Sequence, residues 1–229
     1  MWKAPVDRGP SDLLHTLELP LYVHAPYLIN VATTKDDVRE RSQASLAATC
    51  AAAARVGALG VVVHGGHLPV GVDPAVGVAN WRATLEALET DVPVLIENTA
   101  GGKNPMARNV AQIERLWAGL DGVHTPYGFC LDTCHLHSGV DDDVVESSRA
   151  IRTVVGTVDL LHVNDSHDDA GSGRDHHANL GDGNIDPDAL LTVIAETDAP
   201  VIVETPGGAD AQRADLTWMR ERLPDAHGG

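Results

Sequence analysis

Short apolar runs rich in valine, leucine and isoleucine alternate along this chain with longer stretches rich in alanine and leucine. The six runs are Leu21–His24, Val61–His64, Val92–Glu97, Gly128–Asp132, Val158–Asn164 and Pro200–Glu204. Continuous apolar runs of this length are typical of parallel strands that are covered on both faces. Because parallel strands need crossover connections, their alternation with helices predicts an α/β fold.

The stretches between these runs have the residue spacing and the boundary residues of helices. The longest is expected at Asp36–Val56, with Thr33 or Thr34 as its N-cap and with Gly57 and Gly60 punctuating its end. Further helices are expected at Pro74–Glu89, Asn109–Leu120, Asp142–Val155, Pro187–Glu196 and Ala211–Leu223.

The number of repeating units bounds the architecture. The 229 residues suffice for one core, and no low-complexity linker interrupts them, so a single domain over residues 1–229 is expected. A closed (β/α)₈ barrel has eight strands, and six strand–helix units are recognisable. We therefore expect a TIM (β/α)₈-type barrel that is incomplete, with its first two strands missing or encoded upstream. The first and last strands would then be open edges, which promote self-association, unless Met1–Leu19 or another chain fills the gap.

Composition narrows the possible locations and partners. No apolar run approaches the roughly 20 residues needed to span a bilayer, and the first residues lack an apolar signal-peptide core. The three cysteines form no even framework, so a cytoplasmic protein with no membrane partner is expected. The formal net charge of −17 argues against a nucleic-acid partner. Bound metal ions would offset that argument by supplying positive charge locally, and an acidic composition also fits a host with high internal salt.

Every apolar run ends in, or just after, a residue that can bind a metal ion. These residues are His24, His64, Glu97, Asp132, His162 and Glu204. In a barrel, the carboxyl ends of the strands share one face, so these side chains are expected to converge. Each would be ordinary alone, as a surface histidine, a helix cap or an ion-pair partner. Six unpartnered buried ionisable groups would be costly, and metal ions would remove that cost.

Three more candidate ligands lie close by in the sequence. His135 follows Asp132 by three residues. Asp175 and His177 lie in a Gly- and Asp-rich segment that is too long to serve only as a connection between two elements. Nitrogen and oxygen ligands without a thiolate suit zinc or manganese. Nine ligands are too many for one ion and suit three ions if a carboxylate bridges.

At these residues the chain resembles the endonuclease IV family of apurinic/apyrimidinic endonucleases. The matching stretches run in family order from residue 24 to residue 206. They are HAPYLIN at 24–30, VVHGGH at 62–67, IENTAGG at 96–102, GFCLDTCH at 128–135, HVNDS at 162–166, DHHANLGDGNI at 175–185 and IVETP at 202–206.

The resemblance implies a (β/α)₈ barrel with three zinc ions, one of which could be Mn²⁺. The motif match assigns the first ion to His24, His64 and Glu97. It assigns the second to Glu97, Asp132, His162 and Glu204, and the third to His135, Asp175 and His177. As the bridging ligand, Glu97 is also the catalytic candidate that would orient the attacking water.

The same resemblance implies a reaction and a substrate. Such an enzyme cleaves the phosphodiester 5′ to an abasic site in damaged double-stranded DNA during base excision repair. Tyr27 and Leu28 match a loop that enters the minor groove. Trp2 and Lys3 match the trailing edge of a second DNA-penetrating loop.

The chain also departs from the family pattern. His67 stands in a shortened motif and is expected to be displaced, while His176 replaces an arginine that is common there. Together with His137 and His167, these histidines are expected to lie mostly at a polar rim, and Cys134 is expected to pack inward.

Two other interpretations remain open at this stage. A sugar isomerase or epimerase with one or two metal ions would use the same barrel. A truncated, inactive remnant would bind metal without cutting DNA.

Overall fold

The computed structural model of the protein describes residues 19–140 and 143–223, which group into two compact units. The first unit comprises residues 19–97, 103–107 and 115–129. The second comprises residues 98–102, 108–114, 130–140 and 143–223. Among these residues, no helix is long and apolar enough to cross a membrane. The expectation of a single domain over residues 1–229 stays a prediction.

Each of the six apolar runs coincides or overlaps with a strand of one parallel sheet, which confirms the α/β class. The strands are β1 (Tyr22–His24), β2 (Gly60–His64), β3 (Val94–Glu97), β4 (Tyr127–Asp132), β5 (Leu160–His162) and β8 (Val201–Ile202). Their order in the sheet is β1-β2-β3-β4-β5-β8, so the first and last strands are its edges, as expected. Six strands, within the described residues, are two fewer than a closed TIM barrel contains, which agrees with an incomplete barrel. Two-residue strands, β6 (Asp165–Ser166) and β7 (His177–Ala178), form a separate antiparallel pair.

All the predicted helices are present. The helices of the structure are α1 (Asp36–Arg55), α2 (Pro74–Ala87), α3 (Val110–Leu120), α4 (Thr133–Gly139), α5 (Val144–Val155), α6 (Pro187–Thr197) and α7 (Gly208–Arg222). The predicted N-cap of α1 was wrong, because the cap is Lys35, which makes no side-chain cap hydrogen bond. The Thr33 hydroxyl instead accepts a hydrogen bond from the Lys35 N–H. The short helix α4 was not predicted, since seven residues give too little periodicity to recognise.

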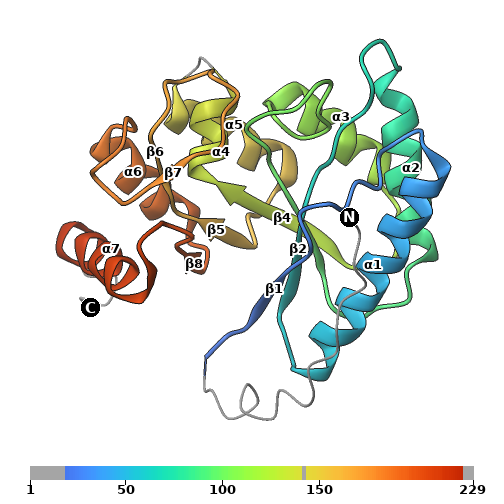
Figure 1. Ribbon diagram of the computed structural model, residues 1–229, viewed down its shortest axis with the longest axis horizontal. Coiled ribbons are helices and arrows are strands. Elements are labelled where there is room, and N and C mark those ends of the chain that lie inside the picture. Colours follow the sequence, from blue (N-terminus) through green and yellow to red (C-terminus); the bar gives the residue numbers. More distant parts are fainter. Residues whose placement is uncertain (1–18, 141–142, 224–229) are drawn as a thin grey trace. The chain divides into compact units, whose positions relative to one another are not determined.

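In the first unit, parallel register aligns the ends of β2 and β3, and it places His24 at the end of β1 opposite Val62 of β2. His64 pairs with Glu97 across β2 and β3, and β1 pairs with β2 in the same direction. Helix α1 packs against β1 and β2 (Figure 1). The buried Trp81 of α2 donates a hydrogen bond of 2.8 Å from its indole nitrogen to the carbonyl of Gly65, directly after β2. A core side chain therefore fixes the segment that follows His64.

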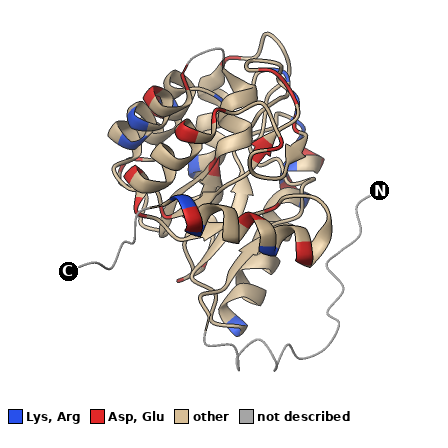
Figure 2. Cartoon of the chain, turned by 90° about the vertical axis from the view of Figure 1, so that its left-hand side faces the viewer, with Lys and Arg blue, Asp and Glu red and all other residues tan. Residues whose placement is uncertain are grey.

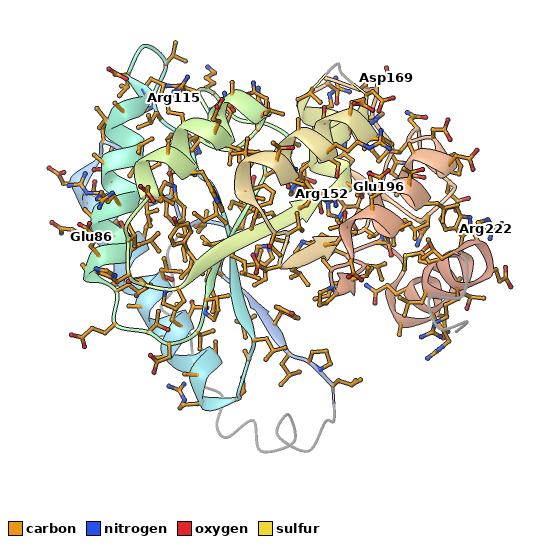
Figure 3. The ribbon with its side chains drawn as sticks, turned by 180° about the vertical axis from the view of Figure 1, so that it is seen from behind. Glu86, Arg115, Arg152, Asp169, Glu196 and Arg222 are labelled. Carbon is orange, nitrogen blue, oxygen red and sulfur yellow. The ribbon has the colours of Figure 1, made fainter. Side chains whose placement is uncertain are left out.

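In the second unit, Asp132 pairs with His162 across β4 and β5. Helices α5 and α6 pack against each other, and Figure 3 shows Arg152 of α5 beside Glu196 of α6. The closest nitrogen–oxygen distance between these two side chains is 3.5 Å. A half-buried ion pair at this distance contributes little to stability. We therefore attribute the stability of this unit mainly to buried side chains such as Ile151 and Leu190.

Acidic and basic residues are interspersed on the helices (Figure 2). Several arginines pair with a carboxylate three or four residues away on the same helix. Examples are Arg82 with Glu86 at 2.8 Å and Arg213 with Asp210 at 2.7 Å. The sequence has 33 acidic residues against 16 basic ones, so the arginines in these pairs come from the less numerous class of charged residue.

Candidate metal centre

In the first unit, the ends of three neighbouring strands bring His24, His64 and Glu97 together. Their ligand atoms lie within 4.8 Å of one another. Both imidazole Nε2 atoms lie 3.2 Å from the same carboxylate oxygen, Oε2 of Glu97. The Glu97 side chain has no exposed surface, and burying a carboxylate requires compensating positive charge. This cluster is a candidate site for one cation.

The hydrogen bonds of His24 indicate where such a cation would bind. Its Nδ1 lies 2.8 Å from the carbonyl oxygen of Ala25, and its Nε2 faces Glu97. Both neighbours accept hydrogen bonds, but a neutral imidazole has a single N–H. A cation between Nε2 and the carboxylate would resolve this mismatch. With a cation there, Nδ1–H donates to the carbonyl and Nε2 is a ligand, which is the usual arrangement in metal sites.

In the second unit, His135, Asp175 and His177 repeat this arrangement. The Nε2 atoms of both histidines lie 3.1 Å from Oδ1 of Asp175. Nδ1 of His135 lies 2.9 Å from the carbonyl of Asn98, and Nδ1 of His177 lies 3.2 Å from the carbonyl of Glu204. Nε2 of His177 is buried and has no hydrogen-bond partner of acceptable geometry. A cation among these three side chains would supply that partner.

The side chains of this second cluster shift the pKa values of Asp175 and His177. Burial alone would raise the pKa of Asp175, but the close contacts of its carboxylate with the His135 and His177 imidazoles outweigh it and hold that pKa well below its usual range. Burial would lower the pKa of His177, but the close contact of its ring with the Asp175 carboxylate and the charge of Asp132 raise it to about 9. The carboxylate therefore already attracts positive charge to this position.

A third group in the second unit comprises Asp132, His162 and Glu204, whose ligand atoms also lie within 4.8 Å of one another. Nδ1 of His162 lies 3.3 Å from Oε2 of Glu204 and 4.0 Å from Oδ2 of Asp132. Asp132 and His162 are almost fully buried, whereas Glu204 is exposed. In agreement with the expected edge position, Glu204 is the least enclosed ligand of the three.

Two buried asparagines that the sequence interpretation missed hold these ligands in place. The Asn164 amide donates to Oδ2 of Asp132 at 2.7 Å and accepts from the Glu204 N–H at 2.8 Å. Asn98 makes two hydrogen bonds to the Asp132 backbone, at 2.7 Å and 3.0 Å. Each asparagine lies within two residues of a strand end, Asn98 one residue after Glu97 and Asn164 two residues after His162. Their position near the ends of strands was the feature of the sequence that could have identified them as part of the site.

Tyr27 and Leu28, which the motif match assigns to a DNA-contact loop, are 75% and 52% exposed. They form the tip of a turn in which the Ile29 N–H donates to the carbonyl of Pro26 at 3.0 Å. The Tyr27 ring meets the His64 ring edge-on, with 5.3 Å between the ring centroids. The exposed tip is therefore adjacent to a candidate metal ligand.

The other histidines divide between the surface and the interior. His67, His167 and His176 are exposed, as expected. His137 was wrongly predicted to lie at the rim, since it is buried and its Nε2 lies 3.1 Å from the carbonyl of Asp168. The buried Cys134 confirms its predicted inward packing. Trp2 and Lys3 lie outside the described residues.

Sequence comparisons identify close relatives of this chain. Residues 11–222 match the family described as "Xylose isomerase-like TIM barrel". The probable endonuclease 4 of Mycobacterium marinum is 47% identical over 222 residues, which span 97% of this chain and 86% of the relative. The probable endonuclease 4 of Mycobacterium tuberculosis is 48% identical over 221 residues, with 96% and 86% covered.

Solved structures agree with these sequence matches. Endonuclease IV from Thermus thermophilus superposes with a TM-score of 0.75 at 32% identity, over 89% of this chain and 75% of that one. A D-tagatose 3-epimerase-like protein has a TM-score of 0.76 at 17% identity, over 92% and 79%, and shows the shared fold alone. The identity to the named relatives extends over nearly the whole chain, and on that ground the chain belongs to the endonuclease IV family within the xylose isomerase-like TIM barrels.

Proposed function

We propose that this chain is a metal-dependent DNA phosphodiester hydrolase that cleaves 5′ to abasic sites in base excision repair. The names of its relatives supply the reaction class. The observation that carries the proposal is that three histidines, His24, His135 and His177, each face a backbone carbonyl with Nδ1 and a carboxylate with Nε2. This arrangement suits imidazoles that bind a metal ion through Nε2.

Three zinc ions, one of them replaceable by Mn²⁺, would fit the nine candidate ligands. The donors are only nitrogen and oxygen atoms, which suits these ions. The proposal that Glu97 bridges two ions and orients the attacking water comes from the motif match. When bound, such ions polarise the phosphate, activate water and stabilise the leaving oxygen. The chain's own contribution is to orient the imidazoles through their carbonyl partners.

The DNA substrate would meet the chain at the metal centre and at the turn formed by Tyr27 and Leu28. Exposed apolar side chains at a turn closed by a backbone hydrogen bond suit insertion into a groove beside a lesion. A net charge of −17 repels DNA at long range, so the bound ions would provide the local attraction. We expect the protein to act in the cytoplasm and to associate weakly with itself through its open sheet edges.

The decisive experiment incubates the purified, zinc-loaded chain with a duplex that contains one abasic site, with and without a chelator. We expect one nick on the 5′ side that leaves a 3′-hydroxyl, which a DNA polymerase can extend. His177→Ala should reduce the rate by about 100-fold or more, because loss of even an outer-shell partner typically costs 10- to 100-fold. His124→Ala, at an exposed histidine outside the clusters, is the matched control.

Other outcomes would favour the two alternatives. One bound ion per chain together with epimerisation of a ketose would indicate the sugar isomerase or epimerase interpretation. Binding of ions without nicking would indicate an inactive remnant. Nicking that persists in excess chelator would contradict metal dependence.

A further inference from the structure

The carboxylate of Asp215 lies in the interior of the second unit, although it belongs to the outer helix α7. Its side chain is 3% exposed. The other aspartate of this helix, Asp210, is 97% exposed and pairs with Arg213. A buried carboxylate is retained at a cost unless several hydrogen bonds satisfy it, so the partners of Asp215 indicate what it does.

Asp215 accepts hydrogen bonds from two segments that are remote from each other in the sequence. From the first segment, the Leu180 N–H donates at 2.9 Å and the Asn179 amide donates at 2.8 Å. From the second segment, the Thr205 hydroxyl donates to the same oxygen that Asn179 contacts. All three donors are uncharged, and hydrogen bonds to a charged acceptor are worth roughly twice those between neutral groups.

Each of these segments carries a candidate metal ligand close to Asp215. Thr205 directly follows Glu204 of the Asp132–His162–Glu204 group. Asn179 lies two residues after His177 of the His135–Asp175–His177 group. Two further hydrogen bonds join the segments directly, from Nδ1 of His177 to the Glu204 carbonyl at 3.2 Å and from the Asn179 amide to the Pro206 carbonyl at 3.2 Å.

We propose that Asp215 is a positioning residue that aligns Glu204 and His177, and so sets the metal affinity of both groups in the second unit together. This inference rests on the proposed metal function. Asp215 itself belongs to none of the candidate ligand groups among the described residues, and its carboxylate oxygens accept three hydrogen bonds from the protein. Its hydrogen bonds fix the backbone next to Glu204 and His177, and the backbone in turn orients these two ligands, as outer-shell partners normally do.

Asp215→Asn is the informative substitution because it nearly preserves the volume of the side chain while it removes the negative charge and one hydrogen-bond acceptor. An amide has one acceptor oxygen and one donor nitrogen. If its oxygen accepts from Leu180, its nitrogen faces the donor amide of Asn179, and the reversed orientation places a donor against the Leu180 N–H. In either orientation of the amide, two hydrogen-bond donors face each other without an acceptor between them. Asp210→Asn makes the same chemical change on the same helix at an exposed position and is the matched control.

The measurement is zinc bound per chain by mass spectrometry, after dialysis against buffers of fixed free zinc concentration. Far-UV circular dichroism and thermal melting of the metal-free chains are recorded in parallel. We expect Asp215→Asn to weaken two ions per chain by about tenfold each, and to leave the ion of His24, His64 and Glu97 unchanged. Combining it with His64→Ala should then weaken all three ions. Asp210→Asn should bind zinc as the unaltered chain does.

The control for a purely structural role is a second, milder substitution. Thr205→Val removes only the hydroxyl on the Glu204 side, so it should weaken one ion and spare the other. A purely structural role predicts instead that zinc loss follows the unfolded fraction. If Asp215→Asn does not fold, Thr205→Val alone tests the positioning role. Unchanged zinc affinity of the Thr205→Val chain then overturns the proposal.

Two results separate this inference from the proposed function. If the unaltered chain binds three ions and Asp215→Asn binds them with the same affinity, the positioning role is wrong and the proposed function stands. If the unaltered chain binds no zinc, the proposed function fails, and this inference fails with it.

Discussion

Replacing Asn164 with alanine tests whether the buried amide network holds the metal ligands. Asn164 has no exposed surface and makes two side-chain hydrogen bonds to candidate ligands. The bond to the Asp132 carboxylate, at 2.7 Å, is charge-assisted, and such bonds contribute about 1.5–3 kcal/mol. The bond from the Glu204 N–H, at 2.8 Å, is neutral and contributes about 0.5–1.5 kcal/mol. Their loss should lower the free energy of unfolding of the metal-free chain by about 3 kcal/mol.

That loss can be measured as a change in melting temperature. For a protein of this size, about 1 kcal/mol corresponds to about 2–4 °C, so Asn164→Ala should melt about 6–12 °C below the unaltered chain. Zinc affinity should fall by about 10- to 100-fold, because both ligands lose an orienting partner.

The matched control is Asn184→Ala, since Asn184 is exposed and its amide donates one hydrogen bond, to the His167 carbonyl. It should change stability by less than about 0.5 kcal/mol. If Asn164→Ala melts within about 2 °C of the unaltered chain and keeps its zinc affinity, the network does not hold the ligands and the reasoning is refuted.

Three further predictions concern reactivity and binding. Burial raises the pKa of the Cys50 thiol to about 11, so iodoacetamide at pH 8 should alkylate it only after denaturation, as mass spectrometry would show; rapid alkylation of the native chain would contradict this. Removing the metal ions should abolish most of the affinity for abasic duplex in a filter-binding or anisotropy assay, because the ions provide the attractive field on an acidic protein; equal affinity of the metal-free chain would be evidence against a metal-centred DNA site. Tyr27→Ala should raise KM for abasic duplex by about tenfold and leave the zinc content unchanged, since base or groove stacking on an aromatic ring contributes about 1–3 kcal/mol. Tyr27→Phe keeps the ring and should restore KM. A loss of zinc in Tyr27→Ala would instead mean that the ring supports His64.

The sequence by itself predicted the strands and the residues at their ends. The apolar runs are long enough to identify buried parallel strands, and the carboxyl ends of parallel strands share one edge. His64 and Glu97 could therefore be expected together from sequence, and the register of β2 and β3 confirms that they are paired. The same reasoning predicted that Asp132 and His162 would meet.

Only the tertiary structure showed which residues support those ligands. Asn164 is polar and His137 resembles a rim residue in sequence, yet both are buried because their partners come from distant segments. The sequence of α7 does not distinguish Asp215 from the exposed Asp210. Asp215 contacts Leu180, 35 residues earlier, and Thr205, ten residues earlier. Local periodicity reports which face of an element is apolar, whereas a hydrogen bond between distant segments depends on how the chain folds back on itself.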